Sequence, residues 1–80
     1  MPRSRASPRH RQLLELLAEA RRSAGLSQVE LALRLARPQS WVSKVEGGER
    51  RLDIIELIEM CEALGQDPVR IVRALAKSSR

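Results

Sequence analysis

The sequence predicts an all-α fold, a compact domain of five short helices, and three observations support that prediction. Eighty residues are enough for one small domain. The apolar content is mostly Leu, Ile, Val and Ala with a single aromatic residue, which favours helices over a β-sandwich. Apolar residues also recur at spacings of three and four between capping and stop signals. We expect a flexible basic arm over residues 1–7, the domain over 8–77 and a frayed tail over 78–80.

The first predicted helix begins at Ser7 and Pro8, because proline is tolerated in a first turn, where its missing N–H has no partner to lose. Gly25 can adopt the left-handed conformation that ends a helix. Helical spacing selects one apolar stripe for the core, formed by Leu13, Leu16, Leu17, Ala20 and Ala24.

The second predicted helix has the clearest start signal in the chain. Ser27 and Glu30 form a capping box, with Leu26 and Leu31 at the staple positions around it. The helix is short because Pro38 disfavours helical geometry in the residue before it. Its buried face consists of Leu31, Ala32 and Leu35.

Three further helices follow. Pro38 opens the third predicted helix, 38–46, which turns Val42 and Val45 toward the core and ends at Gly47-Gly48. A second capping box, Asp53 with Glu56, starts the fourth, and Asp67-Pro68 starts the fifth. Their apolar positions are Ile54, Leu57, Ile58, Cys61 and Leu64 in the fourth and Val69, Ile71, Val72 and Leu75 in the fifth. Helices this short need tertiary support, since nucleation costs more than they recover alone.

The net charge of +5 is unevenly distributed. Residues 1–25 hold six Arg against two Glu, whereas residues 53–80 hold four basic against five acidic residues. A basic front and a mildly acidic back indicate a polyanionic partner approached from one side, although a solvated basic surface would look similar.

Several classes of function have little support. A lone cysteine, Cys61, excludes an internal disulfide framework and a Cys-based zinc site, and its apolar position predicts a buried thiol. His10, the single histidine, is expected at the solvent or DNA side. No nucleophile has a base partner, so we expect no enzyme, cofactor or metal. The chain lacks a signal peptide and an apolar run long enough for a membrane span, which predicts a cytoplasmic, nucleoid-associated protein.

The third predicted helix suits the major groove of DNA. A reading helix must be short, docked on its inner face and furnished outside with small, amide or basic side chains. With the two valines turned inward, the outward residues are Gln39, Ser40, Ser43 and Lys44. Ordinary solvent-facing residues would look the same, so the residues that flank this helix are the stronger evidence for DNA binding.

Candidate phosphate contacts surround that helix. Gln28 stands at the start of the second helix, where free N–H groups and the helix dipole favour an anion. Arg37, Arg50 and Arg51 bracket the third helix from both sides. Trp41 borders the inward valines, so we expect it half packed with its indole N–H free to meet a phosphate; direct base contact is the alternative.

The segments AGLSQVELALRL, VSKVEGGER and ALGQDP resemble the phage-repressor-like, or XRE-type, helix-turn-helix family across about residues 9–76. The resemblance implies a lambda-repressor-like five-helix DNA-binding domain, with Gln28 on a phosphate and Gln39, Ser40, Ser43 and Lys44 facing bases. It also implies an ion pair between Arg21 and Glu46, and a basic arm that reaches around the duplex in some members. Ala36 departs from the family's usual turn glycine, and Arg37-Pro38 from its small polar entry, which puts the first base-contact position in doubt.

We therefore expect a sequence-specific transcription regulator that binds double-stranded DNA as a homodimer on a two-fold symmetric site. The alternative is a protein-interaction adapter, or an antitoxin with a protein partner, built on the same fold; the basic residues around one helix favour DNA. Ile55 with Ile71 or Leu75 is the expected self-association patch, although single exposed apolar residues are normal on any surface.

Overall fold

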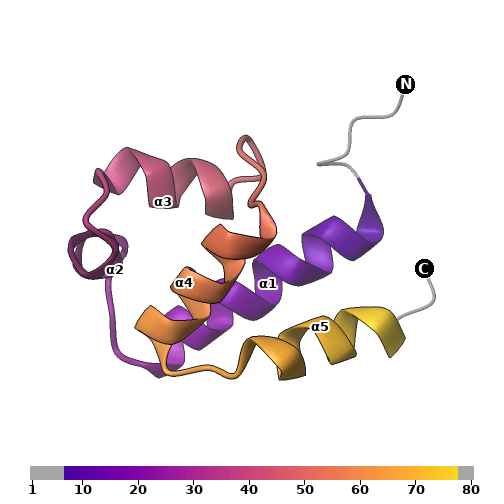
Figure 1. Cartoon of the computed structure of the whole chain (residues 1–80). Helices are drawn as coiled ribbons and strands as arrows, with labels where there is room; N and C mark the ends of the chain where they lie inside the picture. The colour runs from indigo at the N-terminus through magenta and orange to yellow at the C-terminus, as the bar shows by residue number, and fades with distance from the viewer. Residues whose placement is uncertain (1–6, 78–80) are drawn as a thin grey trace.

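The computed structural model describes residues 7–77 and confirms the all-α fold, with no strand in that range. Residues 1–6 and 78–80, which hold most of the expected arm and the tail, lie outside the described residues. The helices are α1 (Pro8–Ser23), α2 (Gln28–Leu35), α3 (Gln39–Glu46), α4 (Ile54–Leu64) and α5 (Pro68–Lys77). α1 contacts α3, α4 and α5, while α2 packs on α3 and α4. Figure 1 shows α3 and α5 on opposite sides of the α1–α4 pair.

The predicted helix starts are present in the structure. The Ser27 hydroxyl accepts from the Glu30 N–H at 3.0 Å, and the Glu30 carboxylate accepts from the Ser27 N–H at 2.8 Å. Asp53 and Glu56 form the same reciprocal pair at 2.7 and 3.0 Å. Pro38 stands at the N-cap of α3 in extended conformation, so α3 begins one residue later than expected. Local side-chain hydrogen bonding therefore defines the starts of α2 and α4, whereas α3 begins without a side-chain cap.

The core differs from the predicted stripe in α1 and α4. Its fully or nearly buried side chains are Leu14, Leu17, Ala20, Leu31, Ala32, Val42, Val45, Leu57, Met60, Cys61, Leu64 and Ile71. Leu14 is a core residue in place of Leu13, which is half-buried, because two adjacent leucines satisfy the helical spacing in either register. Ala24 lies beyond the last turn of α1 and is exposed.

Two further expectations about burial are wrong. His10 is 7% exposed, not on the solvent side, because α1 already turns it inward in its first turn. Ile54 is 59% exposed at the first position of α4, and Met60 occupies the core instead. The expected burial of Cys61 is confirmed, and burial raises the pKa of its thiol, with a smaller effect from the Asp67 charge.

Ala36 ends α2 in the left-handed conformation, with φ 56° and ψ 43°, and is the one non-glycine residue in 7–77 with positive φ. The following Arg37 N–H donates to the Ala32 carbonyl at 3.0 Å, closing the helix end. Alanine therefore occupies this turn with a strained backbone, and a glycine at the same position would relieve that strain.

We expect Ala36→Gly to raise the free energy of unfolding by about 0.5–1 kcal/mol, since relief of the left-handed strain outweighs the added entropy of the unfolded chain. Urea unfolding followed by circular dichroism measures the change. The matched control is Ala18→Gly in the middle of α1, which should lower stability by about 1 kcal/mol. Equal losses at both positions would show that the turn is not strained.

Candidate nucleic-acid interface

The outer face of α3 is polar and accessible. Val42 and Val45 are fully buried and fix the rotation of the helix. The exposed residues of α3 include Gln39, Ser40, Ser43 and Lys44, the side chains expected to face bases. Because valine is small, packing through Val42 and Val45 brings the α3 backbone close to the core. No other element among residues 7–77 covers the outer face of α3.

Behind α3 lies a partly buried ion pair that ties its last turn to α1. Arg21 Nε lies 2.7 Å from Glu46 Oε2, and the two side chains are 13% and 10% exposed. A second Arg21 nitrogen donates to Glu46 Oε1 at 3.2 Å, and a third to the Leu26 carbonyl at 2.8 Å. The guanidinium therefore also holds the α1–α2 connection, so that α1, α2 and α3 meet at one group.

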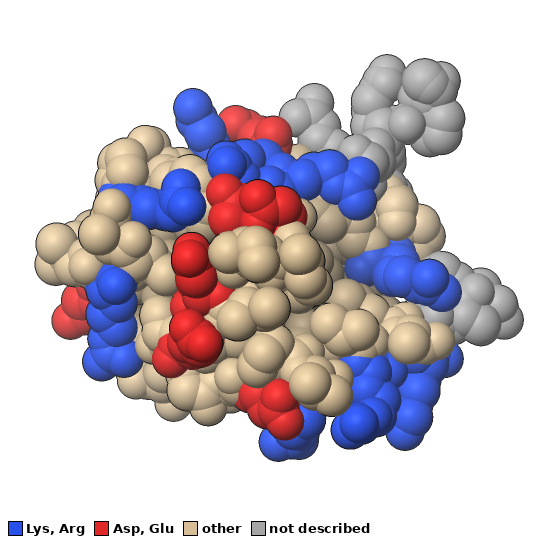
Figure 2. All heavy atoms as spheres, in the orientation of Figure 1, with Lys and Arg blue, Asp and Glu red and all other residues tan. Residues whose placement is uncertain are grey.

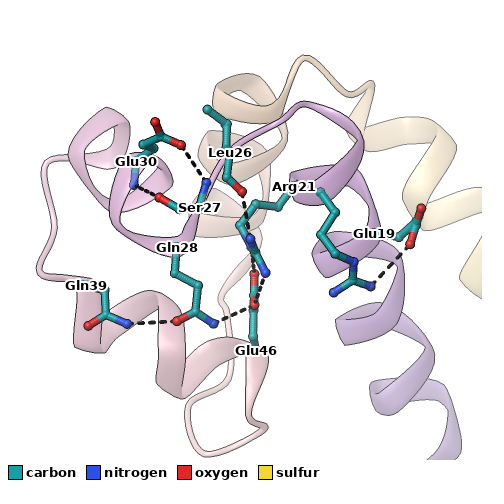
Figure 3. A network of polar contacts seen from close by, with 9 residues as sticks. Glu19, Arg21, Leu26, Ser27, Gln28, Glu30, Gln39 and Glu46 are labelled. Atoms are coloured by element: carbon teal, nitrogen blue, oxygen red, sulfur yellow. Dashed lines mark hydrogen bonds and ion pairs between the residues drawn. The ribbon is translucent and has the colours of Figure 1, made fainter.

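The network continues from this pair to the surface (Figure 3). Gln28 Nε2 donates to Glu46 Oε1 at 2.9 Å, and Gln28 Oε1 accepts from Gln39 Nε2 at 2.9 Å. Both ends of the Gln28 amide are therefore used inside the protein, where the sequence suggested a phosphate contact alone. The amide of Gln39, the first residue of α3, is held in a defined orientation with its oxygen left over.

Trp41 is half-buried and lies against two guanidinium groups. The Cζ atom of Arg37 lies 4.3 Å from the ring centroid, and that of Arg50 lies 5.3 Å away. The partial packing is as expected. The indole N–H was expected to be free for a phosphate, but Nε1 is buried and has no hydrogen-bond partner among residues 7–77. Because Nε1 is buried, the indole N–H is not positioned to reach a phosphate.

Glu56 joins these arginines to α4, a role that sequence analysis missed. Its carboxylate accepts two hydrogen bonds from Arg50, at 3.0 and 2.8 Å, and lies 3.7 Å from Arg37. The Arg50 hydrogen bond, then the Asp53 N–H, lower the pKa of Glu56, so it stays ionised. The only sequence signal for Glu56 was its capping position, which does not reveal the tertiary partners.

The cations expected at the DNA therefore fall into two groups. Arg37 and Arg50 are paired with Glu56, whereas Lys44 and Arg51 are exposed and make no side-chain hydrogen bond or ion pair with residues 7–77. Figure 2 shows Lys and Arg side chains along the edge formed by α3 and the following loop, with acidic side chains over the start of α4. This edge carries the positive charge that a phosphate backbone requires.

The expected self-association patch is only partly on the surface. Ile55 is 59% exposed, but Ile71 is 7% exposed and belongs to the core of the chain, and Leu75 is half-buried. Ile71 is therefore excluded from the patch, because its face of α5 packs onto α1 and α4.

The described part of the chain offers neither a metal cluster nor a membrane-spanning helix. Residues 7–77 contain no group of three or more His, Cys, Asp or Glu side chains that could hold a metal ion. No helix there is long and apolar enough to cross a membrane.

Comparison with known proteins gives three findings. Residues 12–75 match a family model described as a helix-turn-helix domain. An uncharacterised HTH-type transcriptional regulator of Sinorhizobium fredii is 38% identical over 55 residues, which are 69% of this chain and 71% of that protein. The structure of an XRE-family like protein from Pseudomonas syringae pv. tomato is 50% identical, with a TM-score of 0.85 over 90% of this chain and 88% of that one.

Proposed function

This chain belongs to the XRE-type helix-turn-helix family of DNA-binding transcription regulators, and from that premise we propose that α3 reads base edges in the major groove of double-stranded DNA. The observation that carries the proposal is the hydrogen-bond chain from Arg21 through Glu46 and Gln28 to Gln39. This chain orients the Gln39 amide at the start of α3. It uses one donor and one acceptor of the Gln28 amide.

Base reading falls to the exposed residues of α3. Gln39 keeps its amide oxygen and one N–H, the donor and acceptor pair that an adenine presents in complementary form. Lys44 is a donor suited to guanine, and Ser40 and Ser43 are short enough to let the helix approach. An orienting partner matters because a side chain that is already fixed loses less entropy on binding.

Phosphate binding falls to the residues around α3. Arg51 reaches the surface without an acidic partner in residues 7–77, and Gln28 lies in the first turn of α2, whose N–H groups favour an anion. Arg37 and Arg50 are held by Glu56 and Trp41 and would approach phosphates as a fixed pair. A single α3 reads only a few base pairs, so the proposed functional unit is a homodimer on a two-fold symmetric site.

We expect Gln39→Ala or Lys44→Ala to lose about 1–3 kcal/mol of discrimination at particular base pairs, since each removes a base-edge contact. Arg51→Ala should instead weaken binding to all duplexes and shallow the slope of log affinity against log salt by about 1 per subunit. Affinities are measured by fluorescence anisotropy across a salt series, on duplexes selected from random DNA by the wild-type chain and on scrambled ones.

The matched control is Arg22→Ala on α1, an exposed arginine that pairs with Glu19 on the same helix. It should leave both preference and salt slope unchanged. If Gln39→Ala and Lys44→Ala weaken selected and scrambled duplexes equally, α3 does not read bases. If no duplex is enriched from random DNA, sequence-specific binding itself is refuted.

A further inference from the structure

Four side chains beside the proposed DNA-reading surface form one cluster, with Glu56 at its centre. Arg50 donates two hydrogen bonds to the Glu56 carboxylate, at 3.0 and 2.8 Å, and an Arg37 nitrogen lies 3.7 Å from Glu56 Oε2. Both guanidinium groups also lie against the Trp41 ring. Arg37 precedes α3 in the chain and Arg50 follows it, so one carboxylate of α4 holds a cation from each side of the reading helix.

The Glu56 carboxylate is enclosed, whereas its arginine partners are partly open to solvent. The Glu56 side chain is 12% exposed, and those of Arg37 and Arg50 are 33% and 39% exposed. Glu56 is also fixed by the cap of α4, in which Oε1 accepts from the Asp53 N–H at 3.0 Å. A phosphate that approaches from solvent would therefore meet guanidinium groups already bound to a fixed anion.

A carboxylate and a phosphate compete for the same donors of an arginine, because the guanidinium fork binds either anion through two N–H groups. In Arg50, Nη1 and Nη2 both donate to Glu56, and Nη1 also donates to the Arg51 carbonyl at 2.6 Å. Glu56 therefore occupies the fork that a phosphate would take. Its negative charge also offsets one of the two positive charges beside it.

The capping box of α2 shows that capping alone does not require such partners. Glu30 caps α2 as Glu56 caps α4, and its carboxylate accepts from the Ser27 N–H at 2.8 Å. Glu30 is exposed and makes no ion pair within residues 7–77. Helix capping thus accounts for Glu30, whereas the pairing of Glu56 with two arginines needs another explanation.

We propose that Glu56 determines specificity by suppressing the binding of DNA whose sequence α3 does not read. Binding to random DNA depends almost entirely on phosphate charge. Pairing with Glu56 weakens the charge that Arg37 and Arg50 offer to phosphates, and it leaves the base contacts proposed for α3 unchanged. The inference rests on the proposed function, because a preference among sequences requires base reading.

A selected site loses less affinity from this pairing than random DNA does. When α3 reads its site, the duplex is bound in one register and its phosphates have fixed positions. Arginines already held by Glu56 and Trp41 lose less entropy on meeting those phosphates, which compensates part of the weakened charge. Random DNA offers no favoured register, so it is bound best by mobile, unpaired arginines. Glu56 is thus a positioning residue that acts through Arg37 and Arg50.

The variant Glu56→Gln tests this role, because it removes the negative charge but keeps a side-chain oxygen for the cap. Affinity for scrambled duplexes should rise about five- to tenfold at low salt, and the slope of log affinity against log salt should steepen by about 1 per subunit. Affinity for the selected duplex should rise less than about threefold, since the freed arginines must be ordered again on binding. Fluorescence anisotropy across a salt series measures all three.

The matched control is Glu30→Gln, which makes the same substitution in the capping box of α2. It also removes one negative charge but frees no arginine, so sequence preference and salt slope should stay those of the wild-type chain. Thermal unfolding checks that both variants are folded. If Glu56→Gln strengthens binding to both kinds of duplex equally, or changes the salt slope no more than Glu30→Gln does, the proposal is wrong.

A second measurement leaves Glu56 and its cap in place. Because Glu56 already occupies the donors of Arg50, Arg50→Met should shallow the salt slope on scrambled DNA by less than about half as much as Arg51→Ala. Arg51 is exposed and has no acidic partner within residues 7–77. Equal effects of the two variants would contradict competition between Glu56 and phosphate.

A double-variant background tests whether Glu56 acts through the arginines. With Arg37→Met and Arg50→Met in place, adding Glu56→Gln should no longer raise affinity for scrambled duplexes. A rise of the same size in that background would show that the Glu56 charge acts on DNA directly, and it would overturn the positioning role.

This inference and the proposed function fail in different ways. A wild-type chain that prefers no duplex would refute base reading by α3 and so the proposed function. A wild-type chain that prefers its selected duplex, together with a Glu56→Gln variant of unchanged preference, would refute the role of Glu56 alone.

Discussion

Replacing Glu46 by alanine is expected to lower the free energy of unfolding by about 3 kcal/mol, because it leaves a buried charge without its partner. Arg21 would keep only the Leu26 carbonyl as an acceptor, with its side chain 13% exposed. Gln28 would also lose the acceptor of its Nε2 donor, so the orientation of Gln39 would loosen. Stability and base preference should therefore fall together.

Urea unfolding of Glu46→Ala, compared with the double variant Arg21→Met, Glu46→Leu, measures this effect. The double variant removes both charges and should recover much of the loss, since the penalty belongs to the orphaned ion. Glu19→Ala is the surface control: Glu19 and Arg22 are paired at 3.3 Å but are 70% and 58% exposed, so the cost should be below about 0.5 kcal/mol. A similar small cost for Glu46→Ala would contradict a structural role for the ion pair.

Trp41→Ala should lower the free energy of unfolding by about 2–3 kcal/mol, somewhat less than a fully buried tryptophan would. The change removes the ring on which Arg37 and Arg50 are stacked, as well as its apolar contact with the core. Without the ring, Arg37 keeps only Glu56 as a partner, while Arg50 keeps Glu56 and the Arg51 carbonyl, so the loop after α3 should become more mobile. Hydrogen exchange of residues 47–52 reports that mobility.

Trp41→Phe distinguishes packing from hydrogen bonding at this position. Phenylalanine keeps a ring in contact with the guanidinium groups and removes an indole N–H that has no partner among residues 7–77. Its cost should therefore stay below about 1 kcal/mol, because loss of ring area is offset by removal of an unsatisfied buried donor. A loss as large as that of Trp41→Ala would show that the N–H is bonded and that the ring contacts matter less.

Much of the fold followed from local sequence because its signals act over three or four residues. Ser27 with Glu30, and Asp53 with Glu56, satisfy N–H groups within a single turn and so define helix starts wherever they occur. Val42 and Val45 determined the inner face of α3, and with it the set of exposed residues offered to DNA. These predictions needed no knowledge of neighbouring elements.

Other features depend on which helices meet, and the sequence alone could not decide them. Leu13 and Leu14 fit the same periodicity, and only packing selected Leu14 for the core. From the sequence, Glu56 is identified only as a capping residue. In the fold, Arg50 and Arg37 also lie at its carboxylate. The left-handed conformation of Ala36 was likewise not indicated by its residue type, because alanine rarely adopts a positive φ.

The sequence by itself determined the helices, their caps and the polar face of α3, because each depends on residues within one or two turns. The tertiary structure alone decided how those side chains are held: Gln28 between Glu46 and Gln39, and Trp41 in contact with two arginines. It also placed Ile71 inside and Ile54 outside. Such contacts join residues far apart in the chain, and their geometry is set by packing several helices at once.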